Sequence, residues 1–526
     1  MGTVKNPILR GFNPDPSICR VGDDYYIATS TFEWFPGVQI HHSRDMINWK
    51  VVAQPLNRVS QLAMEGVPDS GGVWAPCLSW CDGRFYLVYT NSRTKDRLKD
   101  THNYLVTCDR VDGEWSEPVY INSYGFDPSL FHDTDGRKWF VTMETDFREG
   151  HNRFSGILLE EYDEKQKRCV GPVKKIFLGS DIGFTEGPHL YHIGEYYYLM
   201  VAEGGTFEGH AVTVARSKNI DGPYELDPGT PMLTSRDKPE DFLQRAGHGS
   251  LVQAQNGEWF LAHLCGRPIG KDRGYCVLGR ETALQNVYFN EEGWLRVKGG
   301  GNGPSETVEV PFEGPAPEPV RKRYTFEPGM KWDMDLQTLR RPLTEEVMSL
   351  TARPGWVRLY GKESLLSKFN QAIVARRQQS FVFSASTALE FEPDYFKQMA
   401  GLVYYYNTTQ YYYLRVSHDE KLGRMLAILS CDNGEYSEPF AYVKLPEKGK
   451  IWLKIEGNYE VVRFFYSTDG VYYEPYGTDC DATRISDEHI NDSAFTGAFI
   501  GMCAQDMSGF SRHADFEYFE YLGDEI

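Results

Sequence analysis

Three carboxylates, Asp15, Asp127 and Glu186, stand at or next to the same place in a short motif that recurs along the chain. For any one of them a turn would be a sufficient role, because aspartate beside proline favours turns. Three acids at equivalent positions are harder to explain in this way. Carboxylates brought together out of water repel one another, and the repulsion raises the pKa of at least one of them. Such a group could supply a general acid and a general base near neutral pH.

The motif ends in an apolar residue, and each copy is followed by a glycine and then by a short aromatic strand pattern. Each unit therefore predicts two strands joined by a glycine turn. The copies lie roughly sixty residues apart, which is the spacing expected of propeller blades. They occupy residues 15–18, 75–78, 127–130, 187–190 and 248–251. Five units predict a five-bladed β-propeller, in which the three acids converge near the mouth of the central channel.

Composition excludes several classes of protein. Acidic residues outnumber basic ones by 74 to 55, which argues against nucleic acid or an anionic membrane as the partner. We find neither a signal-peptide pattern at the N-terminus nor an apolar run of membrane-spanning length. The ten cysteines form no CxxC pair, which favours reduced thiols and a cytoplasmic protein.

The chain is long enough for two or three domains, and all of them are predicted to be built from strands. Residues 1–305 carry the five repeats and are predicted to be the propeller. Residues 306–323 are rich in Gly, Pro and Glu and are predicted to be a linker. Residues 324–526 continue with strand patterns and hairpin signals but without the motif, which predicts a β-sandwich of jelly-roll type.

Long segments of the sequence resemble the β-xylosidases of glycoside hydrolase family 43. These segments are residues 11–18, 22–38, 69–76, 125–130, 185–190, 278–283, 350–355 and 495–499. The resemblance covers nearly the whole chain. It implies an inverting, exo-acting enzyme that releases xylose from the non-reducing ends of β-1,4-xylooligosaccharides, with α-L-arabinofuranosidase as a side activity. Close relatives are often tetramers, so a homo-oligomer, a tetramer or a dimer, is expected.

The resemblance also assigns roles to the three acids. Asp15 would be the general base that activates water, and Glu186 the general acid that protonates the leaving oxygen. Asp127 would orient the acid and keep its pKa raised. Inversion is consistent with this division, because it needs a base and an acid about 6.5–9.5 Å apart with a water between them.

The same resemblance predicts the walls of the pocket. Phe32 and Trp74 would stack on the terminal sugar, although blade core is the other interpretation of both. Arg280 would hydrogen-bond sugar hydroxyls and moderate the repulsion between the acids. His248 replaces the acid of the fifth motif, where it would either hydrogen-bond in the pocket or bind a hydrated calcium ion. The sandwich would close the mouth of the site with Phe510. The chemistry itself requires no cofactor.

One departure from the family pattern affects specificity. Related β-xylosidases often carry a Trp-Asp pair where this chain reads Glu144 and Thr145, followed by Asp146. Loss of the indole is expected to reshape the pocket wall. An enzyme that acts predominantly as an α-L-arabinofuranosidase therefore remains an alternative.

Two further alternatives belong to other groups. Retaining fructan-active enzymes also have five blades, but they need Asn-Asp-Pro and Arg-Asp-Pro motifs where this chain has Pro14-Asp15-Pro16 and Phe126-Asp127-Pro128. A non-catalytic carbohydrate-binding propeller would keep the aromatic residues. It would have no reason to keep all three acids.

Overall fold

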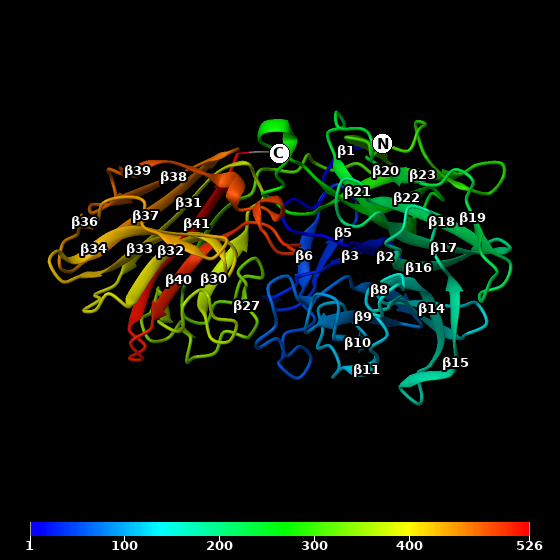
Figure 1. Cartoon of the computed structure of the whole chain (residues 1–526), viewed down its shortest axis with the longest axis horizontal. Coiled ribbons are helices and arrows are strands. Elements are labelled where there is room, and N and C mark those ends of the chain that lie inside the picture. Colours follow the sequence, from blue (N-terminus) through cyan, green and yellow to red (C-terminus); the bar gives the residue numbers. More distant parts are fainter. Residues whose placement is uncertain (1, 525–526) are drawn as a thin grey trace. The chain divides into compact units, whose positions relative to one another are not determined.

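The computed structural model describes residues 2–524, whose regular secondary structure is almost entirely β-strand (Figure 1). The chain divides into two compact units. Unit 1 contains the chain up to Glu33, Gly37–Arg267 and Arg280–Ala316. Unit 2 contains Trp34–Pro36, Pro268–Gly279 and the chain from Pro317 onward.

Within the described residues, unit 1 holds five antiparallel blade sheets, and each is formed by strands that follow one another along the chain, except that β4 (Trp34–Phe35) lies outside the first blade. The first blade consists of β2 (Ser17–Val21), β3 (Asp24–Thr29), β5 (Gln39–Ser43) and β6 (Lys50–Ala53). The second consists of β7 (Gly72–Val73), β8 (Cys77–Cys81), β9 (Arg84–Ser92), β10 (Thr101–Cys108) and β11 (Val119–Asn122). The third consists of β12 (Ser129–His132), β13 (Lys138–Thr145), β14 (Phe154–Asp163) and β15 (Arg168–Phe177). The fourth consists of β16 (Glu186–Ile193), β17 (Tyr196–Glu203), β18 (Ala211–Ser217), β19 (Glu225–Leu226) and β20 (Leu233–Thr234). The fifth consists of β21 (Gln244–Gln253), β22 (Trp259–Gly266), β23 (Glu281–Phe289) and β24 (Leu295–Val297).

Each copy of the motif lies at or within the first long strand of a blade, and the aromatic pattern that follows it forms the next strand. Ile18 pairs with Ile27 and Leu130 pairs with Phe140 in these hairpins. The first and fifth blades share one apolar core, in which Ile18 packs in the same cluster as Phe260. This shared core closes the ring, and the predicted five-bladed propeller is confirmed.

Hydroxyl groups of the motifs connect neighbouring blades. The Ser17 hydroxyl of the first blade accepts a hydrogen bond from the backbone N–H of Leu78 in the second, at 3.0 Å. The Ser250 hydroxyl of the fifth blade accepts one from the N–H of Ile18 in the first, also at 3.0 Å. Buried donors need such partners, so these serines fix the first strands of adjacent blades against each other and hold the acids beside them in place.

The predicted linker, residues 306–323, differs from the structure. Its first part forms β25 (Thr307–Val310), which pairs with β1 (Gly2–Lys5) and belongs to unit 1. Its last part opens β26 (Arg321–Thr325) of unit 2. The two valines of β25 alternate with Thr307 and Glu309 and are buried, which is the period of a half-buried strand. The Gly- and Pro-rich flanks obscured this pattern.

Unit 2 contains two large antiparallel sheets, and the predicted β-sandwich is confirmed. The first sheet is built from β26, β28 (Met348–Ser349), β29 (Val357–Tyr360), β41 (His513–Gly523), β31 (Val382–Glu390), β37 (Lys450–Asn458), β38 (Val461–Ser467) and β39 (Glu474–Asp481). The second is built from β30 (Ala372–Arg377), β40 (Phe499–Asp506), β32 (Gln398–Asn407), β33 (Gln410–Asp419), β34 (Gly423–Asp432), β35 (Glu435–Ser437) and β36 (Val443–Lys444). Side chains of both sheets form one apolar core.

A short segment from the first blade region also belongs to unit 2. It forms β4 (Trp34–Phe35), which pairs with β27 (Thr338–Leu339). The indole of Trp34 is fully buried and stacks on Phe499, with ring centroids 3.7 Å apart. Burial of an aromatic side chain of this size stabilises a fold by about 2–3 kcal/mol, so this segment is an anchored part of the sandwich.

Helices are rare in the part of the chain that the structure describes. They are single 3-10 turns, η1 (Lys271–Arg273), η2 (Ala482–Arg484) and η3 (Asp487–His489). Among these residues there is no apolar helix of membrane-spanning length.

Candidate active site

Four of the five motifs share an uncommon backbone conformation at one position. Asp15, Asp127, Gly187 and His248 have φ angles of 54°, 54°, 56° and 47°. The left-handed region is unfavourable for residues other than glycine, and such residues concentrate where function requires a particular geometry. The sequence repeat is therefore also a repeat of backbone shape. It presents Asp15 and Asp127 in the same way in two blades, while Glu186 lies one residue before the equivalent position.

Asp15 is held by two donors from different parts of the propeller. The Ser30 hydroxyl, just after β3, donates to Oδ2 at 2.5 Å. The Arg280 guanidinium, just before β23, donates to Oδ1 at 2.8 Å. All three residues are buried, so Arg280 balances the charge of Asp15 in a site with little water. Arg280 was predicted from the resemblance, whereas Ser30 was not, because a serine at a strand end carries no specific signal.

Asp127 and Glu186 are buried together. The backbone N–H of Gly187, the residue after Glu186, donates to Oδ2 of Asp127 at 3.1 Å. Burial, and then the negative charge of Asp15, raises the pKa of Glu186 to about 8. Burial, and then the charges of Glu186 and Asp15, raises the pKa of Asp127 well above its usual range. The structure therefore brings the three predicted acids within electrostatic reach of one another, with a protonated carboxyl group available at neutral pH.

The aromatic residues predicted for the pocket lie beside these acids. The rings of Phe32 and Trp74 have centroids 6.5 Å apart, and the Arg280 guanidinium lies 5.4 Å from the centre of Phe32. The indole N–H of Trp74 donates to the carbonyl of Ser70 at 3.0 Å, and its ring meets the edge of Phe126 at 4.9 Å. Phe32 and Trp74 thus form one aromatic wall against the arginine and the acids, as expected of a site for a small polar ring.

His248 is close to the acids, and its surroundings bear on the predicted calcium site. Its Nδ1 lies 3.9 Å from Oδ1 of Asp15. Burial lowers the pKa of His248, which favours the neutral ring. Within residues 2–524 no group of three or more His, Cys, Asp or Glu side chains could hold a metal ion. Calcium takes six to eight oxygen ligands. The side chains present therefore do not fit a directly ligated calcium ion, and a hydrated one stays a prediction.

We expect chelator treatment to leave the activity unchanged to within about twofold, because the described side chains offer no multidentate calcium site. The measurement is the initial rate on a nitrophenyl glycoside after dialysis against EDTA, with and without added Ca²⁺. Loss of activity that Ca²⁺ restores and Mg²⁺ does not would contradict this expectation and support the hydrated ion at His248.

Phe510, predicted to contact the mouth of the site, belongs to unit 2. It follows β40 in a turn before β41, and 82% of its surface is exposed. All the other predicted site residues belong to unit 1. The closing role of Phe510 and of the sandwich remains a prediction.

Sequence reasoning missed one charged residue of the site, Lys99. Its ammonium lies 5.4 Å from the centre of the Trp74 ring, and the side chain is half-buried. Its positive charge opposes the rise in the pKa of Glu186. Burial lowers the pKa of Lys99 itself, and the charges around it come from Asp96, Arg153, Glu186 and Lys95. A lysine in a charged connecting segment has no sequence signal that separates it from its neighbours.

The substitution Lys99→Met is expected to shift the alkaline limb of the kcat/KM profile to higher pH. With Glu186 as the general acid that the resemblance implies, the profile falls as Glu186 loses its proton near its pKa of about 8, and removal of a nearby positive charge makes that loss harder. Methionine keeps a long side chain over the Trp74 ring. Lys95→Met, on the same segment, is the matched control. A K99M profile that coincides with that of the wild type would show that Lys99 does not act on the acid.

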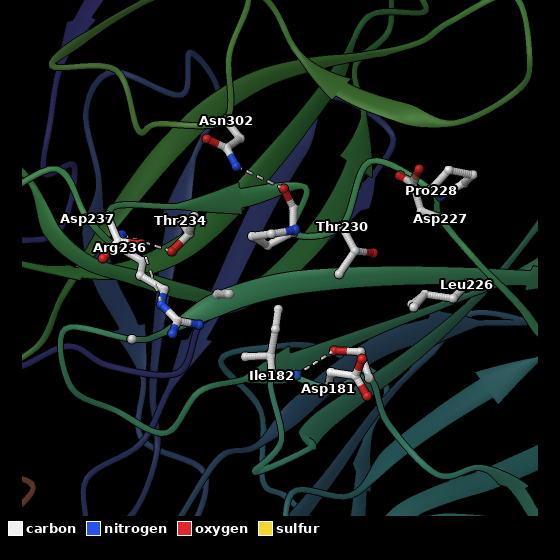
Figure 2. Close-up of a pocket in the computed structure, with 14 residues that line it drawn as sticks. Asp181, Ile182, Leu226, Asp227, Pro228, Thr230, Thr234, Arg236, Asp237 and Asn302 are labelled. Carbon is white, nitrogen blue, oxygen red and sulfur yellow. Dashed lines mark hydrogen bonds and ion pairs between the residues drawn. The ribbon is translucent and has the colours of Figure 1, made fainter.

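Unit 1 contains a hollow of about 550 Å³ (Figure 2). Arg236, Asp237 and Asp181 line it, and the Asn302 side chain donates to the carbonyl of Pro231 at 3.1 Å beside it. None of its 14 lining residues is aromatic, and none is one of the three acids. None of the predicted site residues lines this hollow.

Comparisons with known proteins agree with this site. Residues 4–295 match the glycosyl hydrolases family 43, and residues 323–522 match the beta xylosidase C-terminal concanavalin A-like domain. The chain is 51% identical to a protein of Bacillus subtilis named beta-xylosidase, over 98% of this chain and 99% of that protein. It is 49% identical to xylosidase/arabinosidase 43B of Humicola insolens, over 99% and 98% of the two chains. The crystal structure of a xylan beta-1,4-xylosidase from Bacillus halodurans superimposes with a TM-score of 0.96 at 52% identity, covering 99% of this chain and 100% of that one.

These matches cover both units and the segments that carry the three acids. They set aside the retaining fructan-active group and the non-catalytic propeller that the sequence left open. The chain is a glycoside hydrolase, and it belongs to glycoside hydrolase family 43.

Proposed function

We propose that this glycoside hydrolase is an exo-acting, inverting β-xylosidase. It would release xylose from the non-reducing ends of β-1,4-xylooligosaccharides and remove α-L-arabinofuranosyl groups as a second activity. The observation that carries the proposal is the division among the buried acids: Glu186 has a pKa of about 8, while Asp15 is bound by Arg280 and Ser30. The names of the relatives from B. subtilis and H. insolens support both activities.

In the proposed reaction the protonated Glu186 donates its proton to the oxygen of the leaving sugar as the glycosidic bond breaks. Asp15 takes a proton from a water that attacks the anomeric carbon from the opposite face, which inverts its configuration. The hydrogen bond from the Gly187 N–H to Asp127 ties Asp127 to the backbone next to Glu186. Asp127 would orient the acid there, and the resemblance also gives it the role of keeping the pKa of Glu186 raised.

The mechanism is tested by proton NMR of the first anomer released from xylobiose. Inversion of a β-linkage gives α-xylose first, and mutarotation then produces the β-anomer. If β-xylose appears first, inversion is wrong and a covalent intermediate is required.

Predominant α-L-arabinofuranosidase activity is a second candidate. The observation that favours it is the pair Glu144 and Thr145, which stands where related β-xylosidases often have a Trp-Asp pair, together with the arabinosidase activity in the name of the H. insolens relative. Rates on nitrophenyl β-xyloside, nitrophenyl α-arabinofuranoside and xylobiose, measured side by side, give the ratio of the two activities. A higher kcat/KM on the arabinofuranoside than on both xylosides would establish the second candidate.

The environment and assembly of the enzyme are also proposals. All ten cysteines are free thiols in the structure, which supports a reducing compartment such as the cytoplasm. A homo-oligomer, a tetramer or a dimer, is proposed from the resemblance to the family. Its mass is measured by light scattering as the protein elutes from a size-exclusion column.

A further inference from the structure

A row of aromatic rings leads outward from the active-site wall. The ring of Trp74 meets Phe126 at 4.9 Å between centroids, Phe126 meets Phe154 at 6.1 Å, and Phe154 meets Phe184 at 5.2 Å. Each pair is edge-to-face. Trp74 and Phe126 are at most 8% exposed, Phe154 is half-buried and Phe184 is 54% exposed. The row therefore begins at the acids and ends at solvent.

The position of Phe154 depends on an irregularity in the third blade. Phe154 opens β14 directly opposite Thr145 of β13, and the pairing then shifts by one residue, so that Glu144 pairs with Gly156 and Ser155 has no partner. Such a bulge redirects the side chains beside it. Residues opposite each other share a face of the sheet, so the small side chain of Thr145 leaves room there for the ring of Phe154.

Side chains of neighbouring strands fix this bulge. The Ser155 hydroxyl donates to the carboxylate of Glu144, and the ammonium of Lys175 in β15 donates to the same carboxylate at 2.5 Å. Lys175 also lies 3.2 Å from the Ser155 hydroxyl. Gly156 has a φ of 132°, and a Cβ atom there would lie 2.8 Å from the carbonyl oxygen of Phe177. The two residues in which the chain departs from the family pattern thus have structural roles. Glu144 stabilises the bulge, and the small side chain of Thr145 leaves room for the ring of Phe154.

Phe184 is placed by the segment that carries the general acid. It lies two residues before Glu186 and has a φ of 54°. The preceding Gly183 accepts a hydrogen bond at 2.8 Å from the N–H of Gly204, the residue just after β17. The proton of Glu186 goes to the oxygen of the leaving sugar, so that sugar must lie on the side of Glu186. An exposed ring so close to the acid along the chain is suited to meet it.

We propose that Phe154 and Phe184 form the stacking surface for the leaving sugar, a pyranose whose C–H groups lie on the rings. Glu144 is a positioning residue, because it acts through the bulge that aims Phe154. This inference rests on the proposed function. It also explains how both activities could share one site, since a xylose unit of a chain is the leaving group whether a xylosyl or an arabinofuranosyl group is cleaved.

The test compares two substrates, xylobiose, whose leaving group is a sugar ring, and β-xylosyl fluoride, whose leaving group has no ring. We expect Phe184→Ala to lower kcat/KM for xylobiose about tenfold, which is the upper range for loss of one aromatic contact. The value for β-xylosyl fluoride, whose leaving group is a fluoride ion, is expected to stay within about twofold of wild type. Phe207 is 54% exposed as well and lies outside the row, so Phe207→Ala is the matched control and is expected to change neither rate.

The bulge is tested by two substitutions of Glu144. Glu144→Ala is expected to lower kcat/KM for xylobiose severalfold with little effect on the fluoride, whereas Glu144→Gln, which still accepts from Ser155, is expected to recover most of the loss. The inference is overturned if Phe184→Ala lowers kcat/KM equally for xylobiose and β-xylosyl fluoride, or leaves both values unchanged. A wild-type enzyme that cleaves neither substrate would instead overturn the proposed function, so the two failures are distinguishable.

Discussion

Glu186→Gln is expected to lower kcat for xylobiose about 10³-fold, which lies within the usual contribution of a general acid. Glutamine keeps the size of the side chain but cannot donate the proton that the leaving sugar needs. The alkaline limb of the pH profile, set by the raised pKa of Glu186 of about 8, is expected to disappear with the titrating group. On β-xylosyl fluoride the loss is expected to be much smaller, because fluoride leaves with less help from an acid.

The control for this substitution is Glu195→Gln in the same blade, an exposed carboxylate paired with Lys218, which is expected to have wild-type rates. Thermal unfolding of both variants shows whether each is folded. If Glu186→Gln keeps its activity on xylobiose, or loses activity on the fluoride to the same extent, Glu186 is not the general acid.

Asp15→Asn is expected to lower kcat about 10³-fold on both xylobiose and β-xylosyl fluoride. The attacking water must lose a proton whatever the leaving group is, so the good leaving group does not rescue this variant. Asparagine tolerates the left-handed conformation of position 15, and its amide oxygen can still accept from Ser30. The backbone of the motif is therefore expected to be retained while the base is lost.

Asp23→Asn is the matched control, because Asp23 is an exposed residue of the same blade. Its rates on the two substrates are expected to equal those of wild type. If the fluoride is hydrolysed by Asp15→Asn at the wild-type rate, Asp15 does not activate the water, and its place beside Arg280 and Ser30 is structural only. Comparison of the two catalytic variants on the two substrates thus separates the acid from the base.

Repetition made most of unit 1 predictable. A motif that returns five times must adopt the same local structure each time, and blades that bury their faces only against neighbours must form a ring. Asp15, Asp127 and Glu186 could therefore be placed together before any coordinates were known. The shared left-handed φ at the motif position explains why the repeat is so regular, since it preserves a backbone shape and not only a set of side chains.

Contacts between residues that are far apart in the chain had no comparable signal in the sequence. Lys99 lies over Trp74, and its positive charge opposes the rise in the pKa of Glu186, but along the chain it is one of several charged residues in a connecting segment. The bulge at Ser155 depends on a carboxylate in β13 and an ammonium in β15, and no single strand pattern shows that combination. The short segments Trp34–Pro36 and Pro268–Gly279 belong to unit 2, although they interrupt the sequence of the propeller.

The sequence by itself determined the five blades, the sandwich and the three acids, because each of these depends on local periodicity or on a repeated motif. Only the tertiary structure decided where the first unit ends, which donors hold Asp15 and how Phe154 is aimed. These features arise from pairings between residues far apart in the chain, such as Val308 with Val4 and Arg280 with Asp15. Their energies depend on burial and distance, which a linear pattern does not record.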